Sequence, residues 1–113
     1  MNQEKLMEIA RAHRITPDGF EDDYRDDAWW DLPLFTDQAV LAMDGLSGLP
    51  SVPVGGRRAR TSYGLKHELE RRAGAYISNG ALIVAALALG IEIKRMAGSP
   101  RNALIGVTTG QRN

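Results

Sequence analysis

The sequence contains no cysteine among its 113 residues, few aromatic residues (6%) and only two histidines. Without cysteine, disulfide bonds, thiolate catalysis and cysteine-ligated zinc or iron–sulfur sites are excluded. The chain also lacks a nucleophile elbow, a P-loop, a GxGxxG turn and an HExxH pair. We therefore expect a protein that is not an enzyme and that holds no cofactor and no metal ion.

Long apolar runs are also absent. The longest apolar stretch, residues 81–91, is roughly half of the ~20 residues that cross a bilayer, so it predicts a buried core helix. The opening residues Met1–Lys5 lack the basic and then apolar regions of a secretory signal. These features predict a cytoplasmic protein without a membrane partner.

The net charge of zero conceals two halves of opposite sign. Residues 1–54 carry four basic and eleven acidic side chains, and residues 55–113 carry ten basic and three acidic ones. The halves therefore have charges of −7 and +7. Such asymmetry indicates either that the halves attract each other or that each has a partner of its own.

In the acidic half, apolar residues at helical spacing predict an amphipathic helix over Gln3–His13, with His13 packed and neutral at the end of its apolar stripe. Residues Thr16–Gly19 (TPDG) form either a helix cap or a simple turn. The acidic stretch 18–31 is either a weak helix or an ordered loop, because clustered aspartates repel one another and are poor helix formers.

A second, short helix is expected over Gln38–Met43, with Thr36 and Asp37 as its cap and Gly45 as its end. Residues 46–56 are rich in glycine and proline, so they read as a linker between the two charge halves.

The basic half predicts two helices, Tyr63–Ala73 and Gly80–Leu89, joined by a short turn. The second helix is apolar on every side, so it is either the centre of the core or the seam of a homodimer. Residues 91–95 and 103–107, separated by turn-forming residues, predict a β-hairpin. His67 lies on the exposed face of the first helix, where a phosphate contact or plain solvation suits it better than acid–base work.

These elements predict a single α+β domain, mainly helical, with an acidic helical segment (1–45), the linker (46–56) and a basic segment (57–108). The basic segment has the order helix-turn-helix followed by a C-terminal β-hairpin, as in a winged helix.

Basic side chains occur at the places where such folds touch the phosphate backbone: the arm before the helix, the exposed helix face and the hairpin. The predicted nucleic-acid-binding residues are Arg57, Arg58 and Arg60 in the arm, Lys66, Arg71 and Arg72 on the helix, and Lys94, Arg95 and Arg101 in the hairpin. The helix Gly80–Leu89 offers no polar side chains to base edges, so we expect phosphate contacts rather than sequence-specific readout by that helix.

The acidic stretch supports an alternative function, in which the protein binds a basic protein partner. Closely spaced carboxylates with aromatic residues can imitate a nucleic acid and occupy a basic groove, and tryptophans often anchor interfaces. The residues of this second site are Asp22, Asp23, Asp26, Asp27, Trp29 and Trp30. A protein of this kind would act as an inhibitor, for example of a host-defence nucleoprotein, as an anti-CRISPR does.

Several segments of the basic half, Ser62–His67, Glu70, Tyr76–Gly80, Ala85–Leu87 and Pro100–Ala103, resemble small uncharacterised proteins encoded by plasmids and phages. This resemblance implies an accessory of a mobile element, either a DNA-binding regulator or an inhibitor of host defence. It implies no catalytic residues, and it does not extend to the acidic half.

Overall fold

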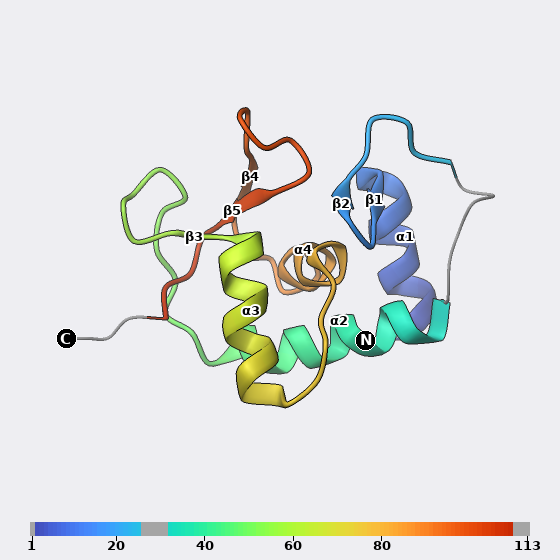
Figure 1. The fold of residues 1–113 in the computed structure, drawn as a ribbon, viewed down its shortest axis with the longest axis horizontal. Coiled ribbons are helices and arrows are strands. Elements are labelled where there is room, and N and C mark those ends of the chain that lie inside the picture. Colours follow the sequence, from blue (N-terminus) through green and yellow to red (C-terminus); the bar gives the residue numbers. More distant parts are fainter. Residues whose placement is uncertain (1, 26–31, 110–113) are drawn as a thin grey trace.

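The computed structural model describes residues 2–25 and 32–109 of the chain. Within them, four helices and five short strands follow one another along the sequence (Figure 1). They are α1 (Gln3–His13), β1 (Ile15–Thr16), β2 (Gly19–Phe20), α2 (Leu32–Ser47), β3 (Arg60–Thr61), α3 (Ser62–Ala73), α4 (Asn79–Ala88), β4 (Ile93–Arg95) and β5 (Ala103–Ile105). The fold is α+β and mainly helical, as the sequence predicts.

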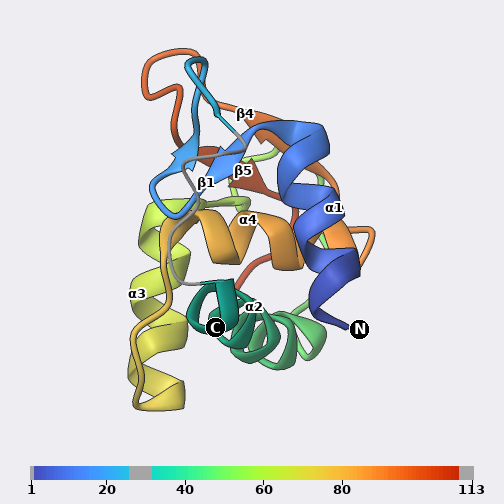
Figure 2. The same ribbon diagram turned by 90° about the vertical axis from the view of Figure 1, so that its right-hand side faces the viewer.

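Helix α4 lies at the centre of the molecule. In Figure 2, α3 lies on one side of α4, α1 lies on the other and α2 runs beneath it, while the strands lie above. Every residue from Asn79 to Ala86 is buried, in a core that also contains Leu6 of α1, Leu46 of α2 and Leu65 of α3. The apolar surface of α4 from Asn79 to Ala86 is therefore covered within the chain, as expected for the centre of the core.

The strands form two antiparallel sheets. Strands β1 and β2 pair as a small hairpin around the turn Pro17–Asp18, so the residues Thr16–Gly19 form a turn and not a helix cap. The second sheet has the order β3-β5-β4, which confirms the predicted hairpin and adds a strand that the sequence did not predict. No helix in the described part of the chain is both long and apolar enough to cross a membrane.

Three helix starts are fixed by local capping. The side chains of Asn2, Thr61 and Ser78 accept hydrogen bonds from backbone N–H groups in the first turns of α1, α3 and α4. These caps satisfy N–H groups that have no partner inside the helix. The predicted bounds are therefore correct for α1 and within one residue for α3 and α4.

The prediction for His13 is wrong, because its side chain is exposed. The helix ends at Arg14, which adopts the left-handed conformation (φ 56°), and the chain then turns so that Ile15 is fully buried behind α1. The apolar stripe of α1 is formed by Leu6, Met7 and Ala10.

Helix α2 is much longer than predicted. Pro33 fits its first turn, where a missing N–H costs nothing, and Gly45 does not end the helix. A Cβ atom on Gly45 would lie 2.8 Å from Leu69 Cδ2, so glycine allows the close approach of α2 to α3. At this position tertiary packing outweighs the tendency of glycine to end a helix.

The segment 46–56, expected to be a linker, begins inside α2 and then lies along the continuation of β5. Ser51 forms a β-bridge with Val107, and the Val52 N–H donates to the Gly106 carbonyl at 2.8 Å. Residues 18–25 of the acidic stretch form β2 and an irregular segment without a helix, and the rest of the stretch lies outside the described residues.

Candidate nucleic-acid interface

The structure divides the nine predicted basic residues into three groups, and the first group faces the acidic half. Arg101 pairs with Asp18 (3.4 Å) and Glu21 (3.2 Å). Arg95 pairs with Asp22 at 3.0 Å, and its guanidinium lies 5.1 Å from the centre of the Phe20 ring. These ion pairs join the hairpin β1–β2 and the residues just after it to the hairpin β4–β5. Part of the charge asymmetry is therefore compensated within the chain.

The second group is held by contacts within the basic half. Arg71 and Arg72 both pair with Glu68, at 2.7 and 3.5 Å, and Arg72 also lines a hollow between α2 and α3 beside Asp44. Arg60 is half-buried and donates a hydrogen bond to the hydroxyl of Thr109.

Lys66 belongs to this group as well, and its assignment to the helix surface is wrong. Only 5% of the residue is exposed, and its Nζ donates to Glu70 Oε2 at 3.0 Å. The ammonium group also lies 4.6 Å from the centre of the Tyr76 ring and 5.9 Å from that of Tyr63. The ammonium group of Lys66 is therefore buried in contacts within the chain.

The third group is Arg57, Arg58 and Lys94, which we call the basic edge. All three side chains are exposed, and none has an ion-pair or hydrogen-bond partner among the described residues. Arg57 and Arg58 lie in a turn just before β3, and Lys94 is the middle residue of β4. In Figure 1, the loop before β3 and the hairpin β4–β5 rise on the same side of the molecule.

The register of the sheet explains the exposure of Lys94. Its Cα partner in β5 is Leu104, which in turn pairs with Thr61 of β3. Because side chains alternate along a strand, the buried Ala103 and Ile105 point to the core, and Leu104 points with Lys94 and Thr61 to the outer face. Lys94 therefore lies on the outer face of the sheet, and Arg57 and Arg58 lie in the turn that leads into its strand β3.

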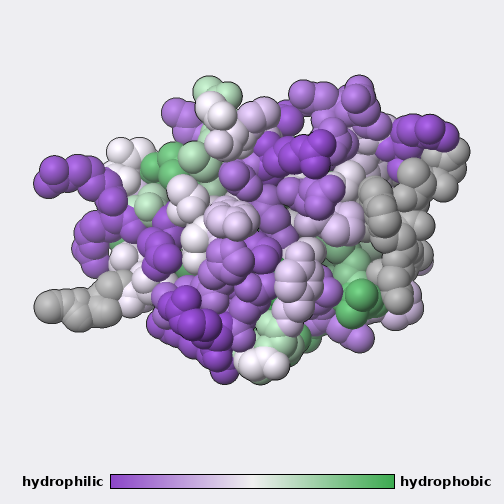
Figure 3. Space-filling view, in the orientation of Figure 1, coloured by the Kyte–Doolittle hydropathy of each residue, from purple (hydrophilic) through white to green (hydrophobic). Residues whose placement is uncertain are grey.

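Helix α4 cannot read base edges, because its residues from Asn79 to Ala86 are buried. Phosphate contacts at the basic edge remain available to a nucleic acid. Hydrophilic residues cover much of the molecular face shown in Figure 3, including the region over α3.

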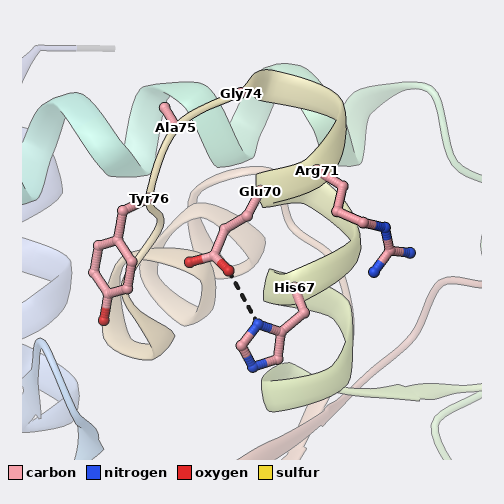
Figure 4. Close-up of a pocket in the computed structure, with 6 residues that line it drawn as sticks. All are labelled: His67, Glu70, Arg71, Gly74, Ala75 and Tyr76. Atoms are coloured by element: carbon pink, nitrogen blue, oxygen red, sulfur yellow. Dashed lines mark hydrogen bonds and ion pairs between the residues drawn. The ribbon is translucent and has the colours of Figure 1, made fainter.

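A shallow open hollow of about 590 Å³ lies at the C-terminal end of α3 (Figure 4). Its lining residues are His67, Glu70, Arg71, Gly74, Ala75 and Tyr76. Glu70 forms the wall of the hollow. Its Oε1 lies 3.0 Å from His67 Nδ1, and its Oε2 accepts from Lys66 and from the backbone N–H of Ile77 at 3.0 Å each.

The same contacts govern the ionisation of Glu70. Burial by itself would raise the pKa of this carboxyl, but the hydrogen bond from the Ile77 N–H, the hydrogen bond and charge of Lys66 and the hydrogen bond from His67 outweigh it. The pKa of Glu70 therefore lies below its ordinary value, and the carboxylate is charged at neutral pH.

The predicted protein-binding site is only partly described. Asp22 is paired with Arg95, and Asp23 is exposed. The positions Asp26, Asp27, Trp29 and Trp30 lie outside the described residues. Among the described residues, no three histidine, aspartate or glutamate side chains come together as a metal-binding group.

Sequence reasoning missed the exposed aromatic residues Tyr63 and Tyr76 around Lys66. One signal was present: Lys66 and Glu70 have the four-residue spacing of a helical ion pair, and Tyr63 precedes Lys66 by three residues. The return of Tyr76 to the same place depends on the connection between α3 and α4, which no local pattern shows.

No protein-family model, curated protein or solved structure significantly matches this chain.

Proposed function

We propose that this protein is a non-enzymatic nucleic-acid-binding protein, an accessory or regulator of a mobile element, and that it contacts phosphates through the basic edge. The observation that carries the proposal is that Arg57, Arg58 and Lys94 are exposed and have no partner among the residues that the structure describes, whereas the other predicted cations are held by contacts within the chain. Unpaired cations on neighbouring elements attract a polyanion without first breaking internal ion pairs.

The arrangement of the basic half supports the same function. The order β3, α3, α4, β4, β5, with β3 joined to the hairpin in one sheet, is compatible with the winged helix-turn-helix that we propose for this half. In such a fold the arm and the hairpin touch the phosphate backbone, and both elements carry the basic edge here. Because α4 is buried, the binding is dominated by phosphates and has little sequence specificity.

The resemblance of the basic half to small plasmid and phage proteins supports the accessory role. The alternative function, an inhibitor that binds a basic protein through the acidic stretch, has less support than nucleic-acid binding. Asp18, Glu21 and Asp22 already pair with arginines of the same chain.

The test is fluorescence anisotropy with labelled mixed-sequence DNA, as a duplex and as a single strand, over a series of salt concentrations. Three phosphate contacts predict that log K falls with log salt with a slope of about −3 for duplex DNA. The double variant Arg57→Gln/Arg58→Gln removes two of these contacts, so its slope flattens by about 2.

The matched control is Lys5→Gln/Arg72→Gln, which removes the same net charge from α1 and from the far side of α3. Both of its side chains already pair with glutamates. If this control weakens binding as much as the arm variant does, the effect comes from net charge and not from the basic edge. An absence of binding at low salt contradicts the proposed function.

A further inference from the structure

Two large aromatic side chains stand exposed beside α3. Tyr63 is 57% exposed and Tyr76 is 64% exposed, although the whole chain has only seven aromatic residues of the Phe, Trp and Tyr types. The rings of Tyr63 and His67 form a T-shaped pair, with 4.6 Å between the ring centres. The exposed side of α3 therefore presents aromatic surface to the solvent.

The ammonium group of Lys66 makes a cation–π contact with each of the two tyrosine rings. This buried group is itself fixed by the Glu70 carboxylate, which also accepts from Ile77 of the connection to α4. A cation under a ring face restrains the ring at little cost when the cation is already desolvated. The rings are thus positioned before any ligand arrives, which lowers the entropy lost on binding.

The remaining groups extend this surface along the helix. Tyr63, His67 and Arg71 follow one another at four-residue spacing, so they form one row over roughly 12 Å of α3. Figure 4 shows two members of this row, His67 and Arg71, at the hollow, with Glu70 between His67 and Tyr76. The ion pair of Arg71 with Glu68 is exposed, and such pairs rearrange at little cost.

Resting on the proposed function, we propose that Tyr63, His67, Tyr76 and Arg71 form a platform that stacks unpaired nucleobases, so that the protein prefers single-stranded nucleic acid. The platform begins two residues after Thr61 of β3, and the turn with Arg57 and Arg58 precedes the same strand. Only β3 separates the two arginines from Tyr63 in the sequence, so the proposal takes a strand bound at Arg57 and Arg58 to continue onto the platform.

A duplex cannot use these groups in the same way. Its bases are stacked on one another, so aromatic side chains reach base faces only in single strands, loops and ends. Duplex readout needs a helix or strand pair in the major groove, and α4 is buried in the core. The exposed aromatic rings and the buried helix are independent observations that favour the same substrate class.

The variant Tyr63→Leu/Tyr76→Leu keeps apolar bulk but removes both aromatic faces, and Tyr63→Phe/Tyr76→Phe keeps the faces and removes only the hydroxyls. The probes are one labelled mixed-sequence 20-mer and its duplex, at a single salt concentration. Because Tyr76 contacts Lys66 more closely, the single change Tyr63→Leu serves if the double leucine variant fails to fold, as judged by circular dichroism.

We expect the wild type to bind the single strand at least about tenfold more tightly than the duplex, with a loss of about tenfold in single-strand affinity for each leucine change. The phenylalanine variant keeps the preference, and duplex affinity is unchanged in every tyrosine variant. Equal affinity for the two forms, or a leucine variant with full single-strand affinity, overturns the platform. If Arg57→Gln/Arg58→Gln still weakens binding in that case, the proposed function stands without it, whereas no binding to either form removes both proposals.

Discussion

At the scale of single residues, Asn79 connects the two halves of the chain. The residue is only 7% exposed, and its amide Nδ2 donates to the Asp18 carbonyl, the Arg101 carbonyl and Asn102 Oδ1, at 2.9, 3.2 and 2.9 Å. These acceptors belong to the turn between β1 and β2 and to the loop between β4 and β5. One side chain at the start of α4 therefore fixes the relative position of two hairpins.

Replacing Asn79 tests this role. Asn79→Ala removes the donor to the Asp18 carbonyl and to Asn102 Oδ1, while the Arg101 carbonyl keeps the N–H of Phe20, so we expect the free energy of unfolding to fall by about 1–3 kcal/mol in urea titrations. Asn79→Asp has nearly the same shape but places a carboxylate among three oxygen acceptors, so it should destabilise more than alanine does. An aspartate variant as stable as the wild type would contradict the hydrogen-bond assignment.

Glu70 should make stability depend on pH. Its folded-state pKa is lowered, so the charged carboxylate stabilises the fold above the ordinary pKa of 4.5, and this contribution is lost as the pH falls below that value. We expect Glu70→Gln to lower the free energy of unfolding at pH 7 and to have a smaller effect in the acidic range. A destabilisation that is equal at both pH values would show that packing, and not charge, is what Glu70 contributes.

Residue-level predictions from the sequence failed where distant segments meet. Lys66 has the four-residue spacing of an ion pair with Glu70, but nothing local shows that Tyr76 covers it. His13 has the right spacing for the apolar stripe, but the left-handed turn at Arg14 ends the helix beside solvent. In both cases the burial depends on where the chain goes next.

At the scale of elements, the packing of the hairpin β1–β2 on α4 depends on Gly80. Its N–H donates to the Pro17 carbonyl at 2.9 Å, and a Cβ atom at this position would lie 1.7 Å from the Thr16 carbonyl oxygen. No side chain can be accommodated there unless the hairpin moves away from the helix.

We therefore expect Gly80→Ala to lower stability by about 1–3 kcal/mol or more, even though alanine favours helices. The matched control is Gly48→Ala, since a Cβ atom at Gly48 has no heavy atom within 4 Å. Thermal unfolding followed by circular dichroism compares the two. Equal melting temperatures for the two variants would contradict the close contact.

Helices with a capping residue and an apolar pattern could be predicted from the sequence. Strands that are formed only by pairing with another segment could not. Helices α1, α3 and α4 have capping residues next to an apolar pattern, so their bounds follow from the sequence within one residue. Strands β1, β2 and β3 have two residues each, which is too short for any alternation to appear. The extension of α2 past Gly45 requires knowledge of its contact with Leu69.

At the scale of the whole molecule, the opposite charges of the two halves have two roles. Arg95 and Arg101 form ion pairs with carboxylates of the first half, whereas the side chains of the basic edge are exposed to solvent. Because the Arg101 pairs are exposed to solvent, Arg101→Gln should cost less than about 1 kcal/mol, and the cost should shrink in high salt. A larger cost in chemical denaturation would mean that these pairs hold the halves together.

The sequence was sufficient to predict that basic residues form the candidate site, but not which of them lie exposed on one surface. The sequence identifies the basic half, and the structure shows that Lys66 is buried and that Arg60, Arg71, Arg72, Arg95 and Arg101 make contacts within the chain. Charge counts along a chain cannot show which cations are already neutralised by neighbours brought together in the fold.

The most direct test is an NMR titration of ¹⁵N-labelled protein with a short single-stranded oligonucleotide. The account predicts chemical-shift changes in residues 57–63, in Lys94 and Leu104, and along the exposed row of α3, with α1 and the hairpin β1–β2 unchanged. Changes confined to α1 and residues 18–25, or no changes at low salt, would contradict the claim that the basic edge and the platform bind nucleic acid.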